Sequence, residues 1–133
     1  DLSFGPTMTP GGFHSFEHRW ALHRAFQFHL QIGKRKIQDR IRELNTYLKT
    51  RLDDAPNVEL MTPMSTELSA GFTFFGVDGM DPEMVTERLL AQHIVVSPAD
   101  RDVGPVVRMA PGLLNNHGEI DYVMKVLAKL PHA

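Results

Sequence analysis

A stripe of aliphatic residues at helical spacing places the strongest constraint on how this chain can fold. The stripe consists of five residues at steps of three and four, Ile37, Ile41, Leu44, Leu48 and Leu52. Charged and amide side chains stand between them, and steps of this kind place side chains on one face of an α-helix. The segment therefore predicts an amphipathic helix that ends near Pro56 and packs its stripe against another part of the fold.

The preceding segment, residues 16–32, predicts a more apolar helix. Four of its residues recur at helical spacing, Ala21, Ala25, Phe28 and Ile32. Four larger apolar residues fill much of the remaining circumference, Trp20, Leu22, Phe26 and Leu30. A helix this apolar has to be covered on most of its sides. Gly33 interrupts the pattern, and the sequence leaves open whether the two helices form one long kinked rod.

The rest of the chain predicts four short strands and two further helices. The strands are β-prone runs bounded by Pro, Gly, Asp or Asn, at residues 58–61, 71–77, 94–97 and 106–109. One helix begins at Asp81-Pro82, an N-cap followed by a proline at the first helical position, and the last helix ends near Leu130. This order predicts an α+β fold: a small antiparallel or mixed sheet of about four strands with helices on one face, preceded by long helices.

The composition bounds the domain organisation and the partners. With 133 residues, 42% of them hydrophobic and 23% charged, the chain fits one globular domain, which we assign to residues 16–133. Residues 1–15 contain clustered proline and glycine and predict an irregular arm or linker. The chain opens at Asp1 without an initiator methionine, so we expect a fragment of a longer protein. A cytoplasmic location is our expectation for that protein. A net charge of −2 and the lack of a long apolar run argue against nucleic-acid and membrane partners.

Residues 11–20, GGFHSFEHRW, contain a candidate metal motif. His14, Glu17 and His18 stand in the H-x-x-E-H arrangement, which on a helix can hold zinc and a general base. A hydrolase of this type needs a further carboxylate ligand from a later helix and a large body around the substrate. The chain offers neither, so we treat a zinc hydrolase as the less favoured alternative and predict no metal.

Arg108, in VGPVVRMAPGLLNN, is the strongest candidate for ligand binding. It stands at the end of an apolar strand beside a Pro-Gly turn. In that position its planar guanidinium can grip a carboxylate through two parallel hydrogen bonds. The alternative is a surface arginine paired with a nearby Asp or Glu.

Two stretches of the chain carry motif residues in a definite order. In FEHRWALHRAFQFHLQIGKRKIQDRIRELNTYLKTRL, a Phe-Glu pair opens a helix, Ile-Gly follows, and an amphipathic helix comes next. In VVRMAPGLLNNHGEIDYVMKVLAKL, a Val-Arg, a Pro, an Asn-rich turn and Glu-Ile-Asp lead into the last helix. Together the two stretches resemble the class V pyridoxal-phosphate-dependent aminotransferase superfamily, in which the amphipathic helix leads into the small domain. The resemblance runs from about Gly12 to Leu130 and is closer to the isopenicillin N epimerase-like branch than to the cysteine desulfurases.

The resemblance implies the C-terminal small domain of a fold-type-I enzyme, usually a homodimer, whose active site lies between a large and a small domain. It implies that Arg108 binds the α-carboxylate of an amino acid substrate, and that pyridoxal 5'-phosphate is bound mainly by a missing large domain of the same chain. The family often has Gly-Thr near the cofactor phosphate where this chain has His18 and Arg19. These two residues are therefore candidates for cofactor binding.

The resemblance also implies that the lysine forming the Schiff base with the cofactor lies in the large domain. The sequence predicts solvated positions for the helical lysines here, Lys34, Lys36, Lys49, Lys125 and Lys129. We therefore expect the isolated chain to be inactive and to supply substrate-carboxylate recognition and domain closure to a parent enzyme. The alternative is a stand-alone module that binds a carboxylate or a partner protein without chemistry.

Overall fold

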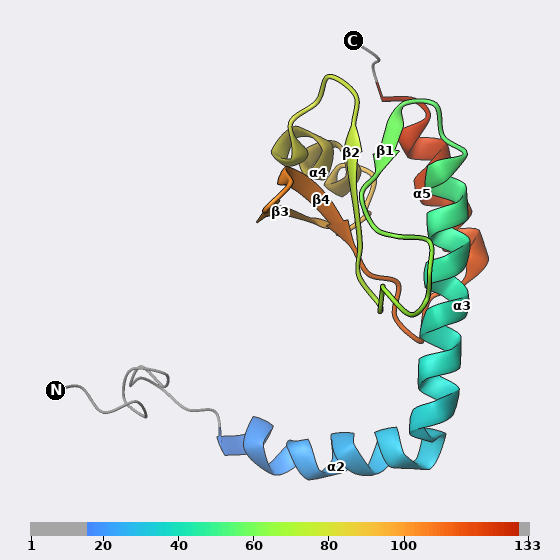
Figure 1. Ribbon diagram of the computed structural model, residues 1–133. Helices are drawn as coiled ribbons and strands as arrows, with labels where there is room; N and C mark the ends of the chain where they lie inside the picture. The colour runs from blue at the N-terminus through green and yellow to red at the C-terminus, as the bar shows by residue number, and fades with distance from the viewer. Residues whose placement is uncertain (1–15, 131–133) are drawn as a thin grey trace, which may run out of the picture. The chain divides into compact units, whose positions relative to one another are not determined.

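The computed structural model describes residues 16–130 (Figure 1). Its elements, in chain order, are α2 (Phe16–Ile32), α3 (Lys34–Asp53), β1 (Val58–Leu60), β2 (Thr73–Val77), α4 (Pro82–Leu90), β3 (Ser97–Arg101), β4 (Gly104–Met109) and α5 (His117–Leu127). The chain divides into two compact units, Asp1–Lys34 and Arg35–Ala133. None of the described helices is long and apolar enough to cross a membrane. The order of helices and strands is the one that the sequence predicts.

The helix α2 is the described part of the first unit. None of the residues of α2 is buried in the part of the chain that the structure describes. Gly33 follows with a φ of 97°, a conformation that side-chain-bearing residues rarely adopt. Its N–H donates to the carbonyl of His29 at 3.1 Å and closes the last turn. The predicted interruption at Gly33 is confirmed, and α2 and α3 are separate helices.

The second unit is built on a four-stranded antiparallel sheet in the order β1-β2-β4-β3. The two edge strands therefore enclose β2 and β4, which pair with Phe75 opposite Val107. The hairpin between β3 and β4 turns through Gly104, whose φ of 101° requires glycine. The α+β fold with a small antiparallel sheet is confirmed.

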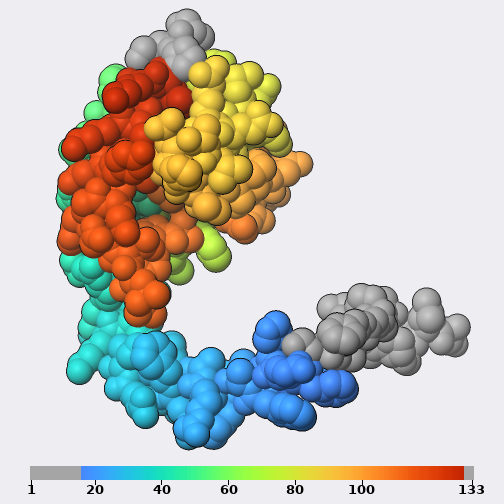
Figure 2. Space-filling model, turned by 180° about the vertical axis from the view of Figure 1, so that it is seen from behind, coloured from blue at the N-terminus to red at the C-terminus, as the bar shows by residue number. Residues whose placement is uncertain are grey.

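One face of this sheet packs against three helices and forms the core. Phe75, Val107 and Met109 point to this face, because side chains alternate along a strand. The stripe of α3 supplies Leu44, Leu48 and Leu52, all fully buried, as the sequence predicts. Helices α4 and α5 complete the core, and they lie side by side on the surface seen in Figure 2. The opposite face of the sheet has no described helix on it.

The third strand differs from the sequence prediction. Residues 94–97 were expected to form it, but the strand is β3, Ser97–Arg101, and the prediction is wrong by a shift of the whole strand. Ile94 is buried in the core below α4, and its N–H donates to the carbonyl of Leu89 at 2.9 Å. Ile94 thus packs in the core below α4 and does not belong to a strand. The strand is the polar segment Ser97–Arg101, which pairs its backbone with β4.

Lys49 is buried, so the prediction that it is solvated is wrong. Its residue is 1% exposed, and its ammonium donates to the carbonyls of Pro63 and Met64 at 2.8 and 2.9 Å and to Ser69 Oγ at 2.7 Å. Burial lowers the pKa of Lys49, because removal from water penalises the charged form. Lys49 therefore attaches the loop between β1 and β2 to α3.

A capping box begins α5. The side chain of Asn116 accepts a hydrogen bond from the Glu119 N–H at 3.1 Å, and the Glu119 carboxylate accepts one from the Asn116 N–H at 3.0 Å. Asn115 Nδ2 also donates to this carboxylate at 3.0 Å. The hydrogen bonds from the Asn115 side chain and the Asn116 backbone lower the pKa of Glu119. The Asn-rich turn before the last helix, predicted from the sequence, thus fixes where α5 starts.

Replacing Lys49 by Met should destabilise the chain. The variant keeps much of the side-chain volume but leaves two loop carbonyls without a donor, so we expect the free energy of unfolding to fall by about 2–3 kcal/mol. Urea unfolding measures the change. Lys125→Met on the exposed surface of α5 is the matched control and should change stability by no more than about 0.5 kcal/mol. Equal stabilities of the two variants would contradict the role of Lys49.

Replacing Glu119 by Gln should remove part of the acid sensitivity of folding. The folded state lowers the pKa of Glu119, so its charge stabilises the fold above its unfolded pKa, and this contribution is lost as the pH falls through the lowered folded value. The difference in stability between the parent chain and the variant should therefore shrink on acidification. Unfolding curves between about pH 7 and pH 3 measure it, and a difference that stays constant would show that the Glu119 charge is not coupled to the cap.

Candidate functional site

Arg108 lies on the face of the sheet opposite the helices. It is the neighbour of Val107 and Met109, which point into the core, so alternation along β4 places Arg108 on the other side. Its Cα partners are Phe74 on β2 and Ser97 on β3. Because β4 is a central strand, Arg108 stands in the middle of the sheet and not at its outer edge. Its position near the end of an apolar strand is as the sequence predicts.

Two neighbours hold the Arg108 side chain. Nε donates to Ser97 Oγ at 3.0 Å, and the guanidinium carbon lies 5.5 Å from the centre of the Phe72 ring. The residue is partly buried. Within residues 16–130 no carboxylate forms an ion pair with it, which removes the alternative of a surface arginine paired with a described Asp or Glu. A fixed guanidinium without an internal counter-ion is suited to bind an anion from outside.

A second arginine, Arg101, lies on the same face of the sheet. Arg101, Ser97 and Arg108 share this face through the pairing of β3 with β4. The guanidinium carbon of Arg101 is 5.1 Å from the centre of the Phe74 ring. Sequence reasoning missed Arg101, Ser97 and the two phenylalanines. The alternation in SPADR would have placed Ser97 and Arg101 together if the strand had been located correctly.

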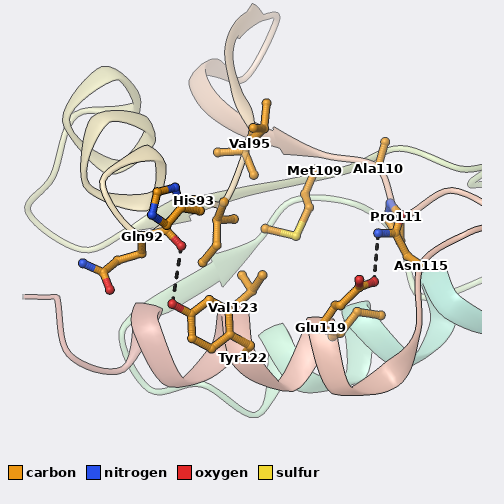
Figure 3. Close-up of a pocket in the computed structure, with 13 residues that line it drawn as sticks. Gln92, His93, Val95, Met109, Ala110, Pro111, Asn115, Glu119, Tyr122 and Val123 are labelled. Carbon is orange, nitrogen blue, oxygen red and sulfur yellow. Dashed lines mark hydrogen bonds between the residues drawn. The ribbon is translucent and has the colours of Figure 1, made fainter.

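One of the described pockets lies on the helix side of the sheet and does not include Arg108. It has a volume of about 420 Å³ and lies between the end of α4, the end of β4 and α5 (Figure 3). Met109 lines it, on the face of β4 opposite Arg108. Some of its polar groups are paired: Asn115 donates to Glu119, and the Tyr122 hydroxyl lies 3.4 Å from the Gln92 carbonyl. The residues that line the pocket include no lysine or arginine that could bind a carboxylate.

The remaining predicted site residues belong to α2. His18 and Arg19 lie in its first turns and are exposed, in the unit Asp1–Lys34, whereas Arg108 belongs to the other unit. The role of His18 and Arg19 at the cofactor stays a prediction. His14 of the zinc motif lies outside the described residues. Among those described, no group of three or more His, Cys, Asp or Glu is placed to hold a metal ion.

Comparisons with known proteins agree with the fold and with the family that the sequence resembles. The model of the aminotransferase class-V family matches residues 6–111. The chain is 30% identical to the isopenicillin N epimerase of Streptomyces clavuligerus over 108 residues. The matched residues make up 80% of this chain and 27% of that protein. The chain thus spans little more than a quarter of the length of this relative.

Solved structures give the same result at the level of the fold. The apo cysteine desulfurase of Thermococcus onnurineus NA1 matches with a TM-score of 0.68 at 21% identity, over 74% of this chain and 27% of that one. A variant of C-DES with glycine covalently linked to its PLP cofactor matches with a TM-score of 0.65 at 19% identity, over 77% and 27%. The family model matches most of the length of the chain, and the chain therefore belongs to the aminotransferase class-V family.

Proposed function

We propose that this chain is the C-terminal part of a PLP-dependent, class V-like enzyme acting on an amino acid, and that Arg108 binds the α-carboxylate of the substrate. One observation supports this most directly. Ser97 and Phe72 hold the Arg108 guanidinium in place on the face of the sheet opposite the helices, and no described carboxylate forms an ion pair with it. Family membership and the relatives, of which this chain spans about a quarter, support the larger parent enzyme.

The residues described do not by themselves make a site for pyridoxal phosphate. A lysine that bonds covalently to the cofactor would have to face the same cleft as Arg108. Lys49 is buried and donates to three acceptors. The other described lysines are exposed on α3, on α5 or just after α5, and these helices lie on the opposite side of the sheet. The cofactor and its lysine are therefore proposed to belong to the rest of the parent enzyme, with His18 and Arg19 as contributors near the phosphate.

Arg108 would bind and orient the substrate. The planar fork can donate two parallel, charge-assisted hydrogen bonds to one carboxylate, which fixes the direction of the bound amino acid as well as its position. Ser97 and Phe72 already hold Nε and the guanidinium plane, so little conformational freedom is lost on binding. A lysine at this position would keep the charge but lose the two-point grip.

The surface of α2 supports a larger assembly. Trp20, Phe26 and Phe28 are among its exposed large apolar side chains, and none of its residues is buried. An apolar surface of this extent marks a contact site. We propose that α2 is covered by the rest of the parent enzyme and by the second subunit of a homodimer, and that the second unit moves on domain closure.

Substituting Arg108 should impair substrate binding by the full-length enzyme. Arg108→Lys and Arg108→Gln should raise KM by roughly 10- to 100-fold, the equivalent of losing charge-assisted hydrogen bonds. Steady-state kinetics measure KM, and the visible absorption of the cofactor reports whether cofactor binding is intact. Arg88→Gln, on the exposed side of α4, is the matched control. An unchanged KM in both Arg108 variants would remove Arg108 from the substrate site.

The competing proposal is a stand-alone binding module, which the separate core of the unit Arg35–Ala133 favours. Light scattering of the 133-residue chain distinguishes the two. A chain that has lost its larger partner should associate through α2, and the double variant Trp20→Gln, Phe26→Gln should reduce this association. Leu114→Gln, an exposed apolar residue of the other unit, should leave it unchanged. If the unsubstituted 133-residue chain is a monomer, the result would favour the stand-alone binding module.

A further inference from the structure

We propose that the parent enzyme acts on amino acids whose side chain carries a second carboxylate, and that Arg101 binds this group. The inference rests on the proposed role of Arg108 as the site of the α-carboxylate. The pairing of β3 with β4 places Arg101 and Arg108 on the same face of the sheet, opposite the helices. Two cations on one open face can receive two anionic groups of a single ligand.

The position of the Arg101 side chain is defined by its contacts. The backbone of Arg101 is opposite Gly104, yet its guanidinium lies over the ring of Phe74, whose backbone is opposite Arg108. The side chain therefore extends along the sheet from the hairpin end towards Arg108. Val106 lies between these two points on the same face and is 1% exposed. Cover of this kind is expected where a long side chain lies across the sheet.

The spacing suits a substrate with two separated carboxylates. The backbone positions opposite the two arginines, Gly104 and Arg108, are four residues apart on β4, or roughly 13 Å. The two guanidinium groups are closer to each other than this, because they rest on Phe72 and Phe74, which are two residues apart. The two ends of an extended diacid can each reach one of the two cations.

The charges on this face favour the same assignment. Within residues 16–130 neither Arg101 nor Arg108 forms an ion pair. Asp100 projects to the other face of β3, and Glu59 stands on β1, at the opposite edge of the sheet. The two rings provide flat apolar walls beside the cations, which suits the methylene chain between the two carboxylates.

Carboxylate titrations of the 133-residue chain test this proposal. Backbone-amide chemical shifts are followed at constant ionic strength, below the concentration at which light scattering detects association. The probes are the diacids glutarate, adipate and pimelate, and the monoacids pentanoate, hexanoate and heptanoate of matching length. We expect at least one diacid to bind about fivefold more tightly than its monoacid, the gain of one exposed ion pair.

Variants separate the two arginines. Arg101→Gln should remove the preference for the diacid and leave monoacid binding unchanged, whereas Arg101→Lys should retain part of the preference because it keeps the charge. Arg108→Gln should weaken both classes of ligand, and Arg88→Gln should change neither. Unfolding curves of each variant establish that the sheet is intact.

The outcomes distinguish this proposal from the one on which it rests. Monoacid binding at Arg108 without any preference for diacids, or with a preference that survives Arg101→Gln, overturns the role of Arg101 and leaves the role of Arg108 standing. The absence of any carboxylate effect at Arg108 overturns both.

Discussion

The packing of one face of the sheet against three helices determines which side chains of the second unit lie in the core and which lie on the opposite face of the sheet. Because side chains alternate along β4, the burial of Val107 and Met109 in the core obliges Arg108 to lie on the opposite face. A shift of register by one residue would exchange the two sets, placing an arginine in the core and two apolar residues outside. The register of β4 that keeps the apolar residues in the core therefore also fixes the face of the sheet on which the Arg108 guanidinium lies.

Much of this fold could be predicted from the sequence, and its errors have physical causes. The stripe of α3 and the start of α4 at Asp81-Pro82 are local patterns, and both lie where the sequence predicts them, although the Asp81 side chain makes no capping hydrogen bond. The position of the third strand differs from the prediction because Ile94 belongs to the core and Val96 packs against that core, while the polar strand that follows pairs with β4. Lys49 was misjudged because its three acceptors lie on a distant loop, which no helical pattern reveals.

The candidate site was predictable only in part for the same reason. Arg108 follows from local sequence, since it ends an apolar strand before a Pro-Gly turn. Ser97, Phe72 and Arg101 join it through the register of three strands, which is a tertiary property. A residue marked by its local sequence, such as Arg108, is thus easier to find than residues such as Ser97 and Arg101, which join it only through strand pairing.

The most direct test of the account is a crystal structure of the full-length enzyme with an amino acid substrate analogue bound. The account predicts that the α-carboxylate receives hydrogen bonds from both terminal nitrogens of Arg108 while Nε remains bonded to Ser97. A carboxylate held elsewhere, with the Arg108 side chain directed into bulk water, would contradict it.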